Sequence, residues 1–195
     1  MIKRIAKIIR IITIPPVMVM VLLLILRSVR GNVFQNNILD LLMSILFLAL
    51  IPVAAYPLQP LIPKYKDKGR EGQRNLAFIF TPIGYIGAIL YGIFTHVSKD
   101  LLLIYFTYLL SVFALLLSNK VMKFRSSGHM CSITGPLIAL VYFIGWILVI
   151  PCCILFGLIC WSSLTLKRHT LYEVIGGCAC CIAAFGCSLV IIAFL

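Results

Sequence analysis

Two short polar segments contain most of the residues in this chain whose types and spacing could perform chemistry. The first is Ser126-Ser127-Gly128-His129, and the second is Arg168-His169-Thr170-Leu171-Tyr172-Glu173. Each combines a histidine with hydroxyl groups and a nearby arginine, at the edge of a long apolar stretch. Such groups are suited to binding and transferring a phosphoryl group. The functional argument therefore depends on whether the two edges face each other.

The first segment has the composition of an anion site. Lys120, Lys123 and Arg125 lead into two serines and Gly128, and His129 follows where a helix is expected to begin. Cations, hydroxyl groups and the N–H groups of a helix start bind anions together. We therefore expect a phosphate or carboxylate to bind here.

The second segment has the composition of an activated nucleophile. Lys167 and Arg168 precede His169, and Glu173 follows four residues later. On a helix these two side chains share a face, so the carboxylate can orient the imidazole through one ring nitrogen. An oriented, neutral imidazole can attack phosphorus. Interfacial histidines and arginines also anchor helices without chemistry, but two such segments on one side favour the functional interpretation.

The same residues resemble the type-2 phosphatidic acid phosphatase (lipid phosphatase) family, with this chain as a divergent member. Its second motif, Pro-Ser-Gly-His, is similar to Ser126-Ser127-Gly128-His129 with the first position changed. Its third motif, Ser-Arg, five residues, His, three residues, Asp, has the spacing of Ser162, His169 and Glu173, and Glu173-Val174-Ile175-Gly176-Gly177 resembles its continuation. The resemblance covers residues 100–195.

The resemblance implies a helical membrane phosphatase that forms a phospho-histidine and uses no metal or other cofactor. His169 would attack phosphorus, Glu173 would orient it, and His129 would protonate the leaving oxygen and then activate water. The phosphate oxygens would be held by the neighbouring hydroxyl, amide and cationic groups, namely Lys120, Lys123, Arg125, Ser127, Gly128, Ser162 and Arg168.

Several positions depart from the family pattern. The first motif, Lys, six residues, Arg-Pro, is absent, and Ser163 and Glu173 replace the arginine and aspartate of the third. A Lys-x-Ser-x-His form, with Arg125 at the lysine, looks like the closest subgroup. Arg125 or Arg168 would supply the missing charge in an active enzyme. A catalytically degenerate relative that binds or moves anionic lipids is the alternative.

The composition is that of a membrane protein. The chain has 195 residues, of which 63% are hydrophobic and only 11% charged, too apolar for a soluble domain. We expect an all-α fold, a single integral membrane domain over 1–195 with the phosphatase-like core at 100–195. Its six to seven transmembrane helices are expected among the apolar stretches at about 11–27, 38–59, 77–95, 101–118, 131–149, 150–162 and 174–195.

The net charge of +12 is distributed as in membrane proteins rather than as in nucleic-acid-binding proteins. With seven crossings and a cytoplasmic N-terminus, all of the 17 lysines and arginines except Arg27, Arg30 and Lys99 face the cytoplasm. We therefore expect a multi-pass protein of the cell membrane with a cytoplasmic N-terminus and active site. The basic stretch from Pro63 to Asn75 is either a solvated loop or a phosphate-collecting rim.

The N-terminal residues allow a second interpretation. Ile2, Ile5, Ile8, Ile9 and Ile12 recur at helical spacing between basic residues, which is typical of an interfacial amphipathic helix over 1–16 that ends at Pro15-Pro16. Six spans would then remain. A retained segment is favoured over a cleaved signal peptide, since no small-residue cleavage site follows.

The stretch from Cys131 to Trp161 decides whether the two segments meet. As one helix it would be ~46 Å long, and as two it would give helices of ~22 Å, against a ~30 Å hydrocarbon core. Pro151 disrupts a continuous helix, and basic residues at both ends favour ends that share a side. We expect a hairpin that reverses between Gly145 and Pro151.

The remaining candidate groups favour packing. The eight cysteines lie in or beside apolar stretches without zinc spacing, and small residues at 176–187 predict close helix contact, so we expect no metal and no disulfide. His96 is expected in a loop on the outer side without chemistry. The leading function is a membrane phosphatase acting on a lipid phosphate or polyprenyl diphosphate. A haem or quinone protein is a weaker alternative, because His129 and His169 lie at helix ends.

Overall fold

The computed structural model describes the backbone of residues 1–195 and every side chain except those of Arg70 and Arg74. It is all-helical, with no strand in the described chain. Five segments are long and apolar enough to cross a bilayer: Ile38–Leu61, Glu71–Phe94, Lys99–Val121, Trp146–Thr165 and Leu171–Phe194. A sixth results if the first two helices are counted as one bent span. The expected all-α architecture with several possible membrane spans is thus confirmed.

The chain begins with two helices that meet at a sharp bend. Helix α1 (Ile2–Ile12) and helix α2 (Pro15–Val29) are inclined by 56°. Ile14 is extended because a residue before proline avoids helical geometry, and Pro15 is suited to the first position of α2. The predicted separate helix ending before Pro15-Pro16 is therefore present. It packs on helix α8 with Ala6 fully buried, while its depth in a membrane stays a prediction.

The next three candidate spans are nearly continuous helices, and two of them begin with polar caps. A short 3₁₀ turn, η1 (Gly31–Phe34), leads to α3 (Ile38–Ile45), η2 (Leu46–Leu50), α4 (Ile51–Leu58) and η3 (Gln59–Leu61), which form one span. Helix α5 (Gly69–Phe94) returns, and α6 (Lys99–Leu116) continues into η4 (Leu117–Val121). The side chains of Asn37 and Ser98 accept N–H groups at the starts of α3 and α6.

The predicted reversal is present and joins the last three helices. Helix α7 (Gly128–Ile144) ends at Gly145, a 3₁₀ turn η5 (Trp146–Leu148) follows, and α8 (Val149–Thr165) runs back before α9 (Leu171–Phe194). With 17 residues, α7 is about 25 Å long, shorter than a bilayer core. Helix α8 also has 17 residues, and the turn η5 extends it to the 20-residue segment Trp146–Thr165, which is long enough to cross a bilayer.

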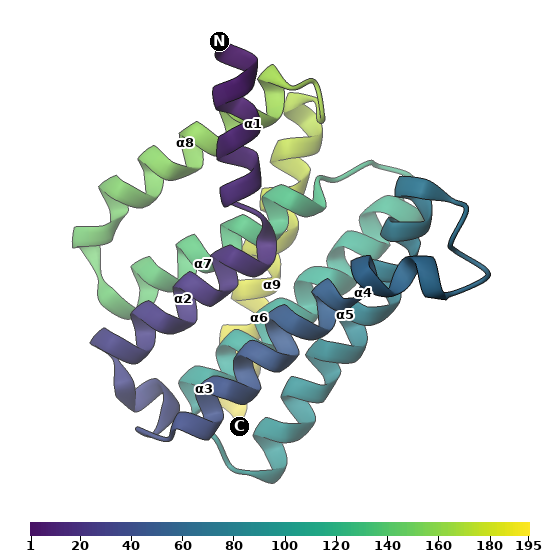
Figure 1. Ribbon diagram of the computed structural model, residues 1–195. Helices are drawn as coiled ribbons and strands as arrows, with labels where there is room; N and C mark the ends of the chain where they lie inside the picture. The colour runs from purple at the N-terminus through teal and green to yellow at the C-terminus, as the bar shows by residue number, and fades with distance from the viewer.

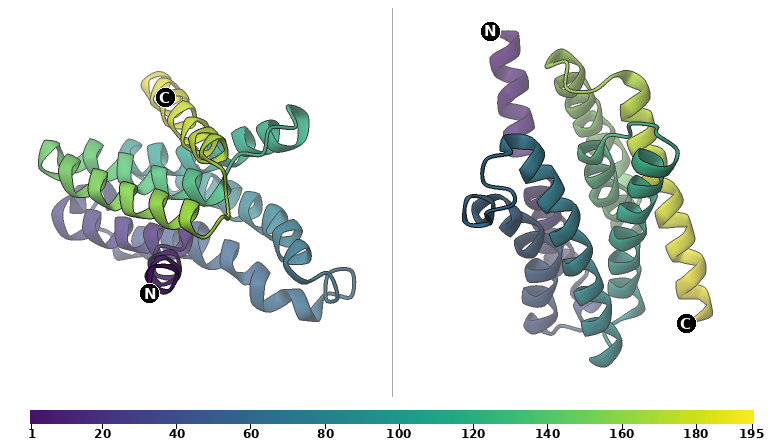
Figure 2. Two further views of the ribbon diagram at one scale, coloured as in Figure 1. Left: turned by 90° about the horizontal axis from the view of Figure 1, so that it is seen from above. Right: turned by 90° about the vertical axis from the view of Figure 1, so that its right-hand side faces the viewer.

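The helices alternate in direction, so one end of the bundle collects the polar segments. The N-terminus, the connection from α4 to α5, the segment between η4 and α7, and the segment between α8 and α9 lie toward one end, while the C-terminus lies at the other (Figures 1 and 2). The reversal at η5 places the start of α7 and the end of α8 together. His129 and His169 therefore belong to the same end, called here the polar end.

Helix α6 lies at the centre of the bundle and packs most extensively on α9. Its Tyr105 is fully buried and shares a 2.7 Å hydrogen bond with the Ser44 hydroxyl of α3. Asp40 is also buried, and its carboxylate accepts a 2.7 Å bond from the Tyr91 hydroxyl. These contacts satisfy polar groups that would otherwise be costly inside the bundle.

Two of the three basic residues that the sequence places at the opposite end bind backbone carbonyls there. The Arg30 guanidinium donates to the Phe143 carbonyl at 2.7 Å, and Arg27 donates to the Asn36 carbonyl at 3.1 Å. Cations near the C-terminus of α7 are favourable, because the last carbonyls of a helix lack partners within it. These two arginines thus stabilise the backbone at this end of the bundle.

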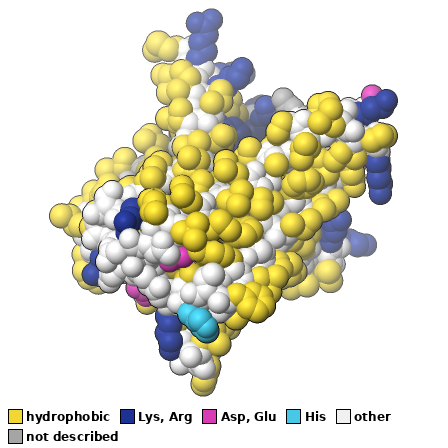
Figure 3. Space-filling view, turned by 60° about the horizontal axis from the view of Figure 1, so that its bottom comes forward, with side chains coloured by type: hydrophobic (Ala, Val, Ile, Leu, Met, Phe, Trp, Pro, Cys, Tyr) yellow, Lys and Arg dark blue, Asp and Glu magenta, His cyan; other side chains and the backbone are white. Residues whose placement is uncertain are grey.

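The outer surface is apolar over most of the bundle. Hydrophobic side chains cover much of the face seen in Figure 3, and lysines and arginines gather at its margins. A soluble monomer rarely exposes so large a continuous apolar face. This surface agrees with helices that contact lipid, whereas the direction in which the bundle is inserted stays a prediction.

The reversal requires glycine at one position. Gly145 has φ 109° and ψ −168°, a region that only glycine adopts readily. We expect Gly145→Ala to destabilise the fold by about 1–3 kcal/mol, because the added Cβ strains the backbone there. Thermal unfolding in detergent measures this change. The matched control is Gly157→Ala inside α8, where the new methyl group meets nothing within 4 Å; equal unfolding temperatures for the two variants would contradict the strain at Gly145.

Candidate functional site

Helix α9 begins with a reciprocal cap that fixes the position of Glu173. The Thr170 hydroxyl accepts the Glu173 N–H at 3.3 Å, and Glu173 Oε2 accepts the Thr170 N–H at 3.1 Å. This is the capping box that a threonine three residues before a glutamate favours. The carboxylate is therefore held at the first turn of α9 by the local sequence.

Glu173 also binds His169, as the spacing predicts. Its Oε2 lies 2.9 Å from His169 Nδ1, and both side chains are mostly buried, with 15% and 16% of their surfaces exposed. The predicted geometry is wrong, because His169 precedes the cap Thr170 and is not helical. The contact forms because the cap turns the carboxylate back toward the residue before it.

A backbone hydrogen bond joins the two polar segments. The Ser127 N–H donates to the Glu173 carbonyl at 2.8 Å. The approach is possible because α9 has Gly176 and Gly177 at this point: a Cβ on Gly177 would overlap the Ser127 carbonyl oxygen, and one on Gly176 would lie 2.8 Å from the Ser126 hydroxyl. The close contact expected of the small residues in this helix is thus confirmed, and it brings the two segments together.

The two serines of the first segment hold its backbone in place through hydrogen bonds. Ser127 is fully buried and caps α7, where its hydroxyl accepts the Met130 N–H at 3.3 Å. The Ser126 hydroxyl shares a 2.6 Å bond with Ser118 of η4, and Asn119 Nδ2 donates to the Ser126 carbonyl at 3.3 Å. The N–H groups of Gly128 and His129, in the first turn of α7, have no carbonyl partner within the helix.

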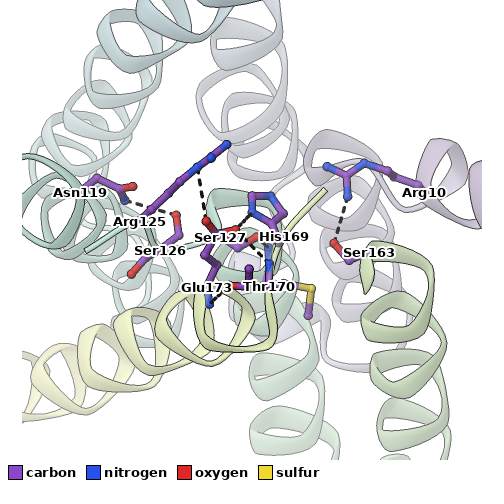
Figure 4. A network of polar contacts seen from close by, with 10 residues as sticks. Arg10, Asn119, Arg125, Ser126, Ser127, Ser163, His169, Thr170 and Glu173 are labelled. Carbon is purple, nitrogen blue, oxygen red and sulfur yellow. Dashed lines mark hydrogen bonds and ion pairs between the residues drawn. The ribbon is translucent and has the colours of Figure 1, made fainter. Parts of the chain in front are cut away.

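Next to the His169–Glu173 pair lies an open cavity of about 300 Å³. It is lined by Arg125, Leu164, Lys167, Arg168, His169, Thr170 and Glu173. Arg125 Nε lies 3.5 Å from Glu173 Oε1, and the arginine side chain is 67% exposed (Figure 4). The exposed guanidinium can still contact a ligand. The cavity therefore combines one carboxylate with three cationic side chains and a histidine.

His129 lies at the start of α7, ahead of the apolar stretch 131–149 and at the polar end, and it is not among the residues that line the cavity. Its Nε2 is buried and has no hydrogen-bond partner among the described residues. Burial lowers the pKa of His129 to about 3, and the positive charges of Arg10 and His169 add to this effect. His129 is therefore uncharged at neutral pH.

Arg10 forms a contact near the site that the sequence analysis did not predict. The sequence placed it only among the basic residues that set orientation, yet its Nη1 donates to Ser163 Oγ at 3.2 Å, across 153 positions of sequence. Ser163 stands where the resemblance expects an arginine. Figure 4 shows Arg10 reaching toward the site from the side opposite Arg125. No local pattern signals this contact, because it depends on how α1 packs against α8.

Other predicted residues lie away from the cavity lining. The Ser162 hydroxyl is buried and donates to the Ala6 carbonyl at 2.6 Å, so it joins α8 to α1. Lys120 and Lys123 are exposed, at the end of η4 and just after it. The basic stretch 63–75 is held in a turn by Gln59, which precedes it and donates to the carbonyls of Tyr65 and Gly69. Arg70 and Arg74 of the proposed rim lie outside the described side chains.

Two further residues of the cavity carry signals in the sequence. Thr170 belongs to the Thr-x-x-Glu pattern of a capping box, which would have predicted its position. Lys167 adjoins Arg168 and adopts a left-handed backbone with φ 50° as the chain turns from α8 toward α9.

No family model, curated protein or solved structure matches this chain. The functional argument therefore depends on the geometry of the site.

The glycine contact between α9 and Ser127 is testable. We expect Gly177→Ala to destabilise the protein by about 1–3 kcal/mol, because the methyl group forces the Ser127 carbonyl away from α9. Thermal unfolding in detergent measures the loss. Gly186→Ala in the same helix is the control, since its methyl group meets nothing within 4 Å. A Gly177→Ala variant as stable as this control would show that the two segments are not in such close contact.

The burial of His129 predicts a pH dependence of stability. An unfolded histidine gains a proton as pH falls below about 6.5, whereas folded His129 stays neutral to a pH of about 3. The unfolded state then binds more protons, so stability falls as the solution is acidified. At pH 5 we expect this group to cost about 2 kcal/mol relative to pH 7.5.

Unfolding measured in detergent at pH 7.5 and pH 5 tests this expectation. The His129→Gln variant removes the titrating group and should lose less stability between the two pH values than the unsubstituted protein. His96→Gln is the control, because His96 is exposed at the opposite end of the bundle. An unchanged pH dependence in His129→Gln would contradict the buried, neutral state of His129.

Proposed function

We propose that this chain is a membrane phosphatase that hydrolyses a lipid phosphate or a polyprenyl diphosphate through a phospho-histidine intermediate. The observation that carries this proposal is the 2.9 Å contact between His169 Nδ1 and the Glu173 carboxylate, beside a cavity with three cationic side chains. The resemblance of the two segments, which include these residues, to the motifs of lipid phosphatases is a second support.

The carboxylate selects the reactive nitrogen of His169. An ionised glutamate only accepts hydrogen bonds, so Nδ1 carries the proton in this pair. The second nitrogen, Nε2, then has a lone pair, and His169 lines the cavity. Glu173 also stabilises the positive charge that His169 acquires when Nε2 bonds to phosphorus. Glu173 is therefore a positioning residue, and His169 is the nucleophile.

The reaction proceeds in two balanced steps. In the first, Nε2 of His169 bonds to phosphorus, the phosphorus–oxygen bond to the lipid breaks, and the leaving oxygen takes a proton from His129. In the second, His129 takes a proton from water, the hydroxide displaces His169, and phosphate leaves. His129 is neutral before the substrate binds, so it can accept a proton, although a pKa of about 3 alone makes it a weak base. For the first step a bound phosphate anion favours its protonated form, because an opposite charge nearby raises a histidine pKa.

The charges around the cavity favour a phosphoryl group. Arg125, Lys167 and Arg168 line it, and its single carboxylate already binds both His169 and Arg125. A phosphoryl group in transfer spreads negative charge over its equatorial oxygens, where such cations stabilise it. The N–H groups of Gly128 and His129 at the start of α7 add two donors of the same kind.

The position of the cavity supports a lipid substrate. It lies at the polar end, between segments that flank α8 and α9, two helices apolar and long enough to cross a bilayer. A phosphate group at the membrane surface reaches this level while its hydrocarbon chain stays among the helices and lipid. The cytoplasmic orientation of this end is part of the proposal and follows the distribution of basic residues.

Phosphate release in detergent or nanodiscs tests the function, with phosphatidic acid and a polyprenyl diphosphate as substrates. We expect His169→Ala to lower kcat by at least about 10³-fold, because it removes the nucleophile. His129→Ala should also lower kcat, because His129 donates a proton in the first step and accepts one in the second; labelled phosphate on His169, held in an acid-labile bond, is the expected intermediate in the unsubstituted protein. His96→Ala is the matched control and should retain full activity.

Two outcomes would overturn parts of this proposal. Activity that survives His169→Ala would refute the phospho-histidine mechanism even in an active enzyme. Tight binding of anionic lipid without turnover on any substrate of a broad panel would favour the degenerate lipid-binding relative. The substitutions at Ser163 and Glu173 are the specific reason to include that panel.

A further inference from the structure

Arg10 occupies an unusual electrostatic position. Its side chain is partly buried, and its one hydrogen bond to a side chain goes to the neutral hydroxyl of Ser163. No carboxylate pairs with it among the described residues, where both ion pairs involve Glu173. A partly buried guanidinium usually has a carboxylate or phosphate partner, because removing it from water is otherwise costly.

The charged groups that interact with Arg10 are also positive. The Arg168 guanidinium acts on it as a neighbouring like charge, and Arg10 in turn acts on His129. Arg168 lines the cavity beside His169. Arg10 is not one of the residues that line the cavity, but it lies on the side of His169 opposite Arg125 and bonds to Ser163, which adjoins the lining residue Leu164 in the sequence (Figure 4).

From this arrangement we infer that Arg10 binds the phosphoryl group of the substrate and that helix α1 is a functional part of the site. This inference rests on the proposed function and adds a binding residue from the opposite end of the chain. The contact of α1 with α8 holds Arg10 in place, since Ala6 is fully buried there and its carbonyl accepts the Ser162 hydroxyl at 2.6 Å.

The number of cations indicates the charge of the ligand. Arg10, Lys167 and Arg168 have no carboxylate partner among the described residues, and Glu173 offsets only Arg125 and His169. A phosphate monoester carries a charge of about −1.5 to −2 at pH 7, whereas a phosphodiester carries only one negative charge. Arg10 therefore favours phosphomonoesters and diphosphates over phosphodiesters.

The full chain in detergent allows a direct binding test with inorganic pyrophosphate, measured by calorimetry. We expect Arg10→Gln to weaken binding about 10- to 100-fold, because it removes a charge-assisted contact while keeping an amide donor for Ser163. Lys7→Gln is the matched control: it removes the same charge from an exposed position of α1 and should change affinity by less than about twofold.

Lipid nanodiscs identify the source of the phosphoryl group. Nanodiscs with phosphatidic acid should compete with pyrophosphate for the unsubstituted protein, and those with phosphatidylglycerol should compete weakly. In Arg10→Gln we expect this preference for the monoester to shrink. Competition by free phosphate alone would assign the site to a soluble phosphate compound instead of a lipid.

The results separate this inference from the proposed function. Arg10→Gln that folds and binds pyrophosphate as tightly as Lys7→Gln would overturn the role of Arg10, even if the protein hydrolyses lipid phosphates. Pyrophosphate binding that depends on Arg10 without turnover would overturn the phosphatase and retain the anion site. Arg10→Lys keeps the charge and provides a second measure if Arg10→Gln unfolds: intermediate affinity is expected, and unchanged affinity would contradict recognition by the planar guanidinium.

Discussion

One carboxylate connects the parts of the candidate site. Glu173 binds the imidazole of His169 and the N–H of Thr170 through one oxygen and faces Arg125 through the other, while its own carbonyl accepts the Ser127 N–H. Residues from both polar segments therefore depend on one position in the first turn of α9. Hydrogen bonds that share one group in a poorly hydrated site stabilise a structure by more than any single contact suggests.

The bundle makes this connection possible by two features of backbone geometry. The turn at Gly145 returns the chain to the end where α7 began. The paired glycines at 176 and 177 then let the first segment approach α9 closely. Helices that cross a bilayer satisfy their own backbone hydrogen bonds, so the irregular segments that carry polar groups are confined to the ends. The candidate site lies among such irregular segments, at the polar end of the bundle.

Local patterns predicted the elements and several contacts. Pro151 and the basic flanks indicated the reversal, the small residues of α9 indicated close packing, and the four-residue spacing indicated the contact of His169 with Glu173. The predicted contact is present, but its geometry differs from the expected one. A helix cap, and not a shared helical face, brings the two groups together. The burial of His129 and the contact of Arg10 with Ser163 depend on packing between distant helices. Single-sequence patterns contain no record of such contacts, so these features were not foreseen.

The capping box at Thr170 has a consequence for how the site responds to heat and denaturants. Helix ends open more readily than helix interiors, and the first turn of α9 is such an end. If this turn unwinds, the Glu173 carboxylate leaves both Thr170 and His169, although the rest of α9 stays packed on α6. The imidazole then loses its orientation before the bundle loses its shape. The orientation of His169 thus depends on a single turn of helix at the polar end of the bundle.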